Sequence, residues 1–172
     1  MNIKKSIITA LLIAIGYILH QIVPGALGGM KFDIMLSMIF VALFINQDFK
    51  NTIITAILGG TITAMTTTFP GGQIPNIIDK VVTCIAVYGM LKATQNFRHS
   101  KIRIGLISFV GTIISGSVFL GSALVFVQLP VSFTTLFIGI VLPTSITNVL
   151  ITSLIYEVIQ KSMRVAGIDL TK

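Results

Sequence analysis

The sequence is poor in charged residues. Of its 172 residues only 10% are Asp, Glu, Lys or Arg, whereas 54% are hydrophobic, and the mean hydropathy is +0.99. A soluble domain normally carries about 25% charged residues. This shortage excludes a water-soluble globular fold, and lipid is therefore the expected solvent for most of the chain.

Cysteine, histidine and recognisable catalytic patterns are also scarce. Cys84 is the one cysteine, which excludes an internal disulfide and a cysteine-based metal site. Neither His20 nor His99 has an acidic residue three or four positions away, as a metal site would require. Sequence patterns for phosphate-binding loops, nucleophile elbows and zinc-protease helices are missing. We therefore expect no metal, no cofactor and no enzymatic activity, and any pumping must draw on an ion gradient or a separate partner.

The basic residues that the chain does contain are spread between its apolar segments. Twelve Lys and Arg residues against five Asp and Glu give a net charge of +7. Nucleic-acid binders gather such residues on one folded face beside aromatic side chains. The distribution here favours a role in membrane topology and in attraction to anionic lipid headgroups, and we expect no nucleic acid as a partner.

Apolar segments that suggest membrane spans recur along nearly the whole sequence. A helix needs about 20 apolar residues to cross roughly 30 Å of hydrocarbon. Breakers such as Pro24-Gly25 and Pro70-Gly71-Gly72 separate the segments. We predict one all-α membrane domain over residues 1–172, and we interpret the first segment as a span rather than a cleaved signal peptide. The six predicted spans are Ser6–Val23, Asp33–Asn46, Thr52–Phe69, Ile77–Leu91, Arg103–Val127 and Phe133–Ile159.

The positions of the basic residues orient these spans. With the amino terminus inside, ten of the twelve basic residues fall in interior segments, and only Lys31 and Lys80 fall in outer connections. This split matches the positive-inside rule. We therefore expect a multi-pass protein of the cytoplasmic membrane with both termini cytoplasmic. The ten interior residues are Lys4, Lys5, Lys50, Lys92, Arg98, Lys101, Arg103, Lys161, Arg164 and Lys172.

Two outer connections share an unusual pattern. Pro24–Asp33 and Phe69–Lys80 each run from Pro-Gly through a pair of glycines to a Lys and an Asp close together. The spans that follow them hold about 13 to 15 residues, which at 1.5 Å per residue reach roughly 20–23 Å, less than the hydrocarbon thickness. We therefore expect their charged residues to lie below the membrane surface in an outer vestibule. These residues are Lys31, Asp33, Asp79 and Lys80.

The four charged residues admit two interpretations. A charge inside the bilayer is costly, so it normally marks a partner, a water-filled cavity or a substrate. Lysine and free helix N–H groups suit a carboxylate, and aspartate suits an ammonium group, so a zwitterionic ligand is one interpretation. In the other, Asp33 caps the second span, Asn76 and Asp79 cap the fourth, and the lysines reach the outer headgroups. The two interpretations can coexist.

Polar residues of the last span allow more than one role. They form a stripe on one helix face, which must point to the protein interior or to a cavity because lipid offers no hydrogen bonds. Asn148 within it is either interhelical glue or a ligand contact. Glu157 is expected to pair with Lys161, four residues further on. The stripe consists of Thr144, Ser145, Asn148 and Thr152.

Two further groups of residues carry weaker signals. Tyr17 and His20, three positions apart at the outer end of the first span, either line the vestibule or lie in the membrane interface. Small residues at helical spacing indicate faces for close helix packing. They include Ala56 with Gly60, Ala10 with Ala14, and Gly105 with Ser108, Thr112 and Ser115.

The two Gly-rich connections also carry a family resemblance. Gly28-Gly29-Met30-Lys31-Phe32-Asp33, and Phe69-Pro70-Gly71-Gly72-Gln73-Ile74-Pro75-Asn76 with Asp79-Lys80, resemble the bacterial tryptophan transport protein family, the TrpP type. The likeness covers essentially the whole chain, although the family commonly has Pro where this chain has Phe32. It implies uptake of L-tryptophan across the bacterial cell membrane. It also implies that the loops around Gly28, Gly29, Gly71 and Gly72 act as a lid, and that Gln73, Asn76 or Asn148 accepts a hydrogen bond from the indole N–H.

That family is in turn similar to the substrate-binding S components of energy-coupling-factor transporters. The similarity implies a six-helix, S-component-like bundle in which Ala10 and Ala14 dock onto a transmembrane coupling subunit served by two ATPases. Two alternatives stay open. One is an S component for another small solute, such as a vitamin, and the other is a membrane sensor that binds its ligand without transporting it.

Overall fold

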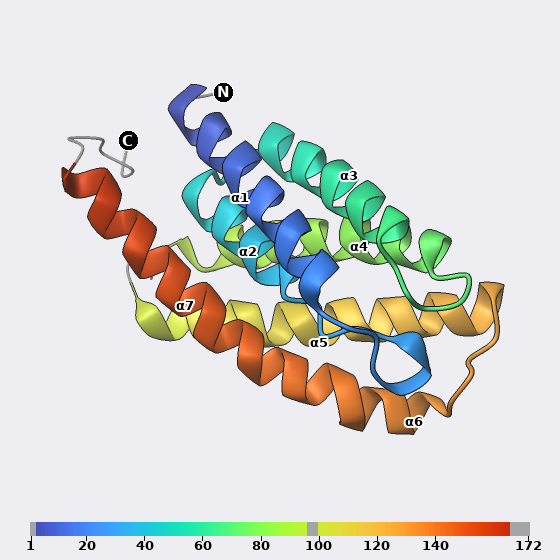
Figure 1. Cartoon of the computed structure of the whole chain (residues 1–172). Helices are drawn as coiled ribbons and strands as arrows, with labels where there is room; N and C mark the ends of the chain where they lie inside the picture. Colours follow the sequence, from blue (N-terminus) through green and yellow to red (C-terminus); the bar gives the residue numbers. More distant parts are fainter. Residues whose placement is uncertain (1–2, 96–99, 166–172) are drawn as a thin grey trace.

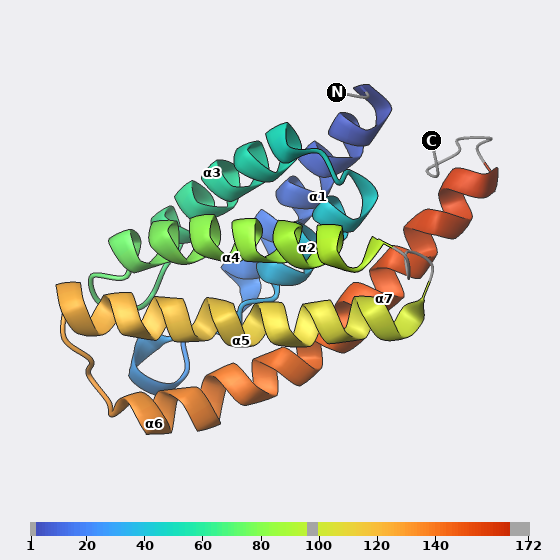
Figure 2. The same ribbon diagram turned by 180° about the vertical axis from the view of Figure 1, so that it is seen from behind.

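The chain folds into a bundle of helices. The structure, a computed structural model, describes residues 3–95 and 100–165, and it contains no strand within those ranges. Figures 1 and 2 show the bundle from opposite sides. The six principal helices are α1 (Ile3–Ile22), α2 (Met35–Ile45), α3 (Phe49–Met65), α4 (Gln73–Ala93), α5 (Lys101–Phe126) and α7 (Leu142–Val165). Three short elements complete the set: η1 (Leu27–Gly29), α6 (Phe133–Leu136) and η3 (Phe137–Val141).

The lengths of these helices confirm an all-α membrane protein. Four of them are long and apolar enough to cross a membrane, namely α1, α4, α5 and the continuous run of α6, η3 and α7 from Phe133 to Val165. Large apolar side chains are exposed along them, for example Leu11 on α1 and Leu150 on α7. Such exposure suits a lipid solvent, because lipid does not penalise apolar surface as water does.

Helix α2 is short and lies in the centre of the bundle. Its 11 residues, all buried, extend about 16 Å at 1.5 Å per residue, which is about half of the roughly 30 Å hydrocarbon thickness. The segment before it, which includes Met30 and Asp33, is not helical. Irregular backbone at membrane depth is tolerated only where protein surrounds it or where it lines a cavity. The prediction of a shortened second span is therefore confirmed.

The prediction of a shortened fourth span is wrong. Helix α4 starts at Gln73 rather than at Ile77 and runs for 21 residues. Pro75 lies in its first turn, where backbone N–H groups have no intrahelical partner, so the missing N–H of proline costs nothing. The Pro-Gly-Gly sequence thus marks the turn before α4, whereas Pro75 belongs to the helix.

The bundle has two distinct ends. In Figure 1 the start of α1 and the end of α7 lie at the same end, together with the α2–α3 connection, the end of α4 and the start of α5; we call this the terminal face. The opposite end, the loop face, carries η1 and the α3–α4 and α5–α6 connections. This arrangement agrees with six crossings. The cytoplasmic location of the terminal face stays a prediction, and two of its predicted basic residues, Arg98 and Lys172, lie outside the described residues.

Helices α5 and α7 cross at an angle. Both views show the two helices crossing (Figures 1 and 2). The second half of α5 packs against α6 and η3 in one apolar cluster, which includes Phe119, Leu136 and Val141. The η3 segment is a π-helical turn that ends at Val141, two positions before Pro143. Such a turn is a common adjustment where proline cannot donate the next helical hydrogen bond and its ring crowds the preceding turn.

One predicted ion pair is wrong. Glu157 pairs with Lys101 at the start of α5, with 2.5 Å between Oε1 and Nζ, rather than with Lys161 on its own helix. The i, i+4 rule considers only one helix, and it does not anticipate a basic residue brought in by an antiparallel neighbour. This pair therefore links α5 to α7 at the terminal face.

Candidate functional site

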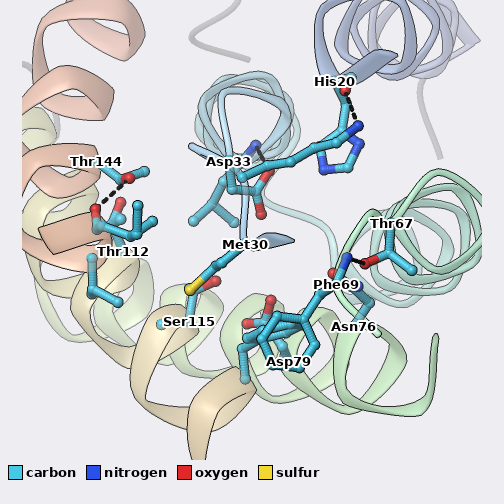
Figure 3. A pocket seen from close by; sticks show the side chains of 16 residues that line it. His20, Met30, Asp33, Thr67, Phe69, Asn76, Asp79, Thr112, Ser115 and Thr144 are labelled. Atoms are coloured by element: carbon cyan, nitrogen blue, oxygen red, sulfur yellow. Dashed lines mark hydrogen bonds between the residues drawn. The ribbon is translucent and has the colours of Figure 1, made fainter. Parts of the chain in front are cut away.

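A cavity opens among the helix ends near the loop face (Figure 3). It contains about 520 Å³ of space between atoms, including the open space at its mouth. Its wall combines charged, hydroxyl and apolar side chains from α1, α2, α4, α5, η3, α7 and the connections between them. The lining residues are His20, Met30, Lys31, Asp33, Leu36, Thr67, Phe69, Asn76, Asp79, Thr112, Ser115, Gly116, Phe119, Ile140, Val141 and Thr144.

One wall of the cavity is built on a cluster of three charges. The Lys80 ammonium lies between two carboxylates, 2.6 Å from Asp33 Oδ2 and in contact with Asp79. Thr83 on the next turn of α4 donates a hydrogen bond of 2.9 Å to Asp79. Lys80 is 1% exposed, so it does not reach the headgroups as one interpretation had it. The cluster carries a net charge of −1 in a region where an unpaired charge would be costly.

Asp33 combines a structural role with a position in the cavity wall. Its Oδ1 accepts a hydrogen bond of 3.2 Å from the backbone N–H of Leu36, so the residue caps the start of α2. Its other oxygen meets Lys80, and the side chain lines the cavity. Structural capping and a position in the candidate site therefore coexist in this residue.

The capping role predicted for Asn76 and Asp79 is wrong. Helix α4 has Gly72 at its N-cap position, and both residues lie inside the helix. Asn76 donates a hydrogen bond of 2.7 Å through Nδ2 to the carbonyl oxygen of Gly72. Its Oδ1 accepts no hydrogen bond from the part of the chain that the structure describes. Asn76 therefore offers an acceptor at the cavity wall.

Lys31 ties together the ends of two helices. Its Nζ donates hydrogen bonds of 3.1 Å to the carbonyl oxygens of His20, near the end of α1, and Thr66, which follows α3. A cation at helix carboxyl ends satisfies carbonyl groups that lack helical partners and suits the negative end of the helix dipole. The Thr66 hydroxyl and His20 Nδ1 are 2.8 Å apart, which adds a further link. His20 is buried in the cavity wall, whereas Tyr17 is exposed and takes no part in it.

Another part of the cavity lining is apolar and partly aromatic. Phe69 and Phe119 make an edge-to-face contact, with 5.2 Å between their ring centroids. Gly116 on α5 lies against η3, and a Cβ atom at this position would lie 2.4 Å from Cγ1 of Val141. The lack of a side chain at Gly116 thus allows α5 and η3 to approach closely beside the cavity.

The two Gly-rich connections meet over the cavity. Gly28, Gly29 and Gly71 have φ values of +60°, +79° and +67°, which glycine adopts without strain. The Thr68 hydroxyl donates a hydrogen bond of 2.7 Å to the carbonyl oxygen of Gly29, joining the two connections. Gly72, by contrast, has an ordinary φ of −68° at the start of α4. Whether these connections act as a lid stays a prediction.

Two of the proposed ligand contacts lie away from the cavity. Gln73 is exposed in the first turn of α4. Asn148 is fully buried, and its amide bonds to α2, to the segment before α2 and to α5. Its Oδ1 accepts from Ser37, while Nδ2 donates to the backbone oxygen of Asp33 and to the Thr112 hydroxyl. Of the two roles considered for Asn148, its contacts support hydrogen bonding between helices. The rest of the predicted stripe is also buried, as expected.

Sequence reasoning missed several hydroxyl groups of the cavity. The sequence analysis assigns Thr112 and Ser115 to helix packing, yet both line the cavity. Thr144 also lines it, in agreement with a stripe that faces the interior or a cavity. The signal was present, since buried hydroxyl residues recur three or four positions apart on one face of α5. No group of three or more potential metal ligands occurs in residues 3–95 and 100–165.

Comparisons with known proteins identify the family. The model of the family described as "Tryptophan transporter TrpP" matches residues 2–164. The chain is 48% identical over 165 residues to a probable tryptophan transport protein of Clostridium acetobutylicum, with 96% of each chain covered. It is 41% identical over 164 residues to one of Bacillus subtilis, with 95% of each chain covered. No solved structure matches. The chain therefore belongs to the tryptophan transporter family.

Proposed function

We propose that this protein takes up L-tryptophan across the bacterial cytoplasmic membrane and captures it from the loop face, which we place outside. The observation that carries the proposal is one cavity that combines a charged wall with an aromatic wall, in a chain of this family. One wall carries the cluster of Asp33, Asp79 and Lys80, and the other carries Phe69 and Phe119. Tryptophan combines the same two chemistries, a zwitterionic head and an apolar ring.

The charged wall supplies partners for both ends of the zwitterion. The substrate ammonium binds the carboxylates of Asp33 and Asp79, where it shares them with Lys80. Lys31 uses two of its three ammonium protons on backbone carbonyls, which leaves the third for the substrate carboxylate. The net charge of the site does not change on binding, because the substrate itself is neutral overall. This matters in lipid, where an added net charge is costly.

The indole ring lies against the aromatic wall. Edge-to-face and offset contacts with Phe69 and Phe119 suit an aromatic ligand. The indole N–H needs one acceptor, and Asn76 Oδ1 is the candidate that both the sequence and the cavity wall support. The hydroxyls of Thr112 and Thr144 donate to backbone carbonyls of their own helices, so their oxygens can also accept.

The energy source divides the proposal into two testable forms. Ala10 and Ala14 lie on the exposed face of α1, where a transmembrane coupling subunit served by ATPases can dock. Enlarging either alanine to leucine should abolish uptake in cells under this form and leave tryptophan binding unchanged. Full uptake by the purified protein alone in proteoliposomes would refute the partner and favour an ion gradient.

The first experiment uses the lack of tryptophan in the chain. Under selective indole excitation the protein itself gives almost no fluorescence. The emission of added L-tryptophan should therefore show a saturable blue shift when the amino acid enters an apolar cavity. Asp79→Asn should weaken binding about tenfold or more, since a charge-assisted hydrogen bond is worth about 1.5–3 kcal/mol. The matched control is Asp48→Asn, which affects an exposed cap distant in sequence.

Three outcomes separate the candidate functions. Saturable binding together with accumulation in vesicles supports transport. Saturable binding without accumulation, with or without coupling subunits, indicates a sensor. No blue shift, together with thermal stabilisation by a vitamin, refutes tryptophan and favours an S component for another solute.

A further inference from the structure

The cavity wall contains a buried histidine, His20, whose two ring nitrogens have different surroundings. The residue is 4% exposed, and Figure 3 shows its imidazole pointing from α1 towards the cavity that it lines. Nδ1 lies 2.8 Å from the Thr66 hydroxyl, whereas Nε2 makes no hydrogen bond within residues 3–95 and 100–165. A nitrogen in this position can be satisfied only by water or by a ligand in the cavity.

The hydrogen bonds of Thr66 determine which ring nitrogen carries the proton. Its hydroxyl oxygen lies 2.7 Å from the carbonyl oxygen of Ile62, as well as 2.8 Å from His20 Nδ1. A carbonyl oxygen can only accept, so the single hydroxyl proton of Thr66 is donated to Ile62. His20 Nδ1 must then donate its own proton to the Thr66 oxygen. In a neutral imidazole this leaves Nε2, on the cavity side, as an acceptor.

The charges around the imidazole favour its neutral form. Asp33, Lys80 and Lys31 lie close enough to act on it electrostatically. With Asp79, which meets Lys80, they make two positive and two negative charges, and these sum to zero. A protonated imidazole would add a net positive charge at membrane depth, which is costly. A bound zwitterion adds no net charge, so His20 stays neutral and its Nε2 stays an acceptor when the site is occupied.

We propose that His20 Nε2 accepts a hydrogen bond from the α-ammonium group of the bound amino acid and makes the site selective for a primary amine. This role rests on the proposed function, in which the ammonium group binds Asp33 and Asp79 and has one N–H left. Lys31 Nζ, the partner of the substrate carboxylate, lies 3.1 Å from the His20 carbonyl oxygen. Because the two substrate groups share one carbon atom, a carboxylate at Lys31 places the ammonium group near His20 as well.

Three acceptors around one ammonium group explain how the site would reject modified amines. Asp33, Asp79 and His20 Nε2 each take one N–H of a primary amine. A methyl group on the nitrogen removes one donor and leaves one buried acceptor without a partner. Sites that hydrogen-bond a substrate group reject analogues without that group strongly, because the buried polar atom is left unpaired.

Two substitutions separate ligand binding by His20 from its link to Thr66. In His20→Asn the amide nitrogen can take the place of Nδ1 and keep the bond to Thr66, but nothing replaces Nε2. In His20→Gln the amide oxygen can take the place of Nε2. His20→Asn should therefore weaken tryptophan binding, measured by the blue shift, about tenfold or more, whereas His20→Gln should stay within about threefold of the unmodified chain. The opposite order would assign His20 to structure alone and overturn the inference.

Methylated analogues identify the substrate group that faces His20. Nα-Methyl-L-tryptophan has lost one ammonium proton and should bind the unmodified chain about tenfold more weakly than tryptophan. In His20→Asn this penalty should fall to about threefold or less. 1-Methyl-L-tryptophan lacks the indole N–H but keeps the ammonium group, so His20→Asn should weaken its binding as strongly as that of tryptophan. An Nα-methyl penalty that is equal in both chains, or a 1-methyl analogue that is insensitive to His20→Asn, would overturn the inference.

The same titrations distinguish failure of this role from failure of the proposed function. The tryptophan concentration at half-saturation does not depend on the fraction of the sample that is folded, so a partly unfolded variant still reports its affinity. Saturable binding that is equal in the unmodified chain and in His20→Asn overturns the role of His20 and leaves tryptophan uptake standing. No blue shift with the unmodified chain overturns both.

Discussion

Replacing Lys80 with methionine should lower the thermal stability of the protein sharply. The substitution keeps most of the side-chain volume but removes the charge that faces Asp33 and Asp79. Removing one partner from a buried ionic cluster costs about 3–5 kcal/mol, because it leaves charge uncompensated. For a chain of this size each kcal/mol shifts Tm by about 2–4 °C, so the expected decrease is about 6–20 °C.

Cys84 provides a probe of the thermal unfolding of this variant. Its thiol is fully buried and free, so a thiol-reactive fluorescent dye reacts with it when the bundle unfolds. The matched control is Lys92→Met on the same helix, where the lysine is exposed and the loss should stay within about 0.5 kcal/mol. A triple variant with Lys80→Met, Asp33→Asn and Asp79→Asn should regain most of the lost stability. Similar melting of Lys80→Met and Lys92→Met would refute a desolvated cluster.

Three further predictions concern the cavity wall and its connections. Gly116→Ala places a methyl group against Val141, so it should lower the free energy of unfolding by about 1–3 kcal/mol and weaken tryptophan binding. Adding Val141→Ala should restore stability and binding, as measured by thermal melting and by the blue shift. Asn76→Ala should weaken binding about 2- to 10-fold by removing a neutral hydrogen bond, whereas Gln73→Ala should leave the titration unchanged; equal effects would contradict the assignment of the acceptor. Gly29→Ala forces a left-handed conformation on alanine, which costs about 1–2 kcal/mol, and places its Cβ 2.6 Å from the Thr68 carbonyl oxygen. Tm should therefore fall by at least about 2–8 °C, and an unchanged Tm would contradict this prediction.

Features set by one segment of chain could be predicted from the sequence. The length of apolar runs predicts a membrane bundle, and the short run after Asp33 predicts the buried helix α2. The two Gly-rich connections also indicate where the cavity opens, because a charge near the hydrocarbon favours a partner or a cavity. In each of these cases the decisive physics is local, namely helix rise against membrane thickness and the cost of a charge in lipid.

Features set by contacts between distant segments could not be predicted. Lys80 and Asp33 are separated by 47 positions, and nothing in either segment specifies that one lysine serves two aspartates. The same limit explains Glu157, whose partner comes from another helix. Asn148 illustrates a subtler case, since its amide suits a ligand or a helix contact equally well. Only the arrangement of α2, α5 and α7 around it distinguishes the two.

The central position of α2 has a consequence for how the protein is made. An 11-residue helix with Asp33 at its start is too short to be held in a bilayer by lipid alone, and its backbone ends need protein around them. During synthesis α2 can therefore reach its final depth only after later helices, including α4 with Lys80, have inserted. Chains shortened before α4 should leave this segment at the membrane surface, where quality-control proteases can cleave it.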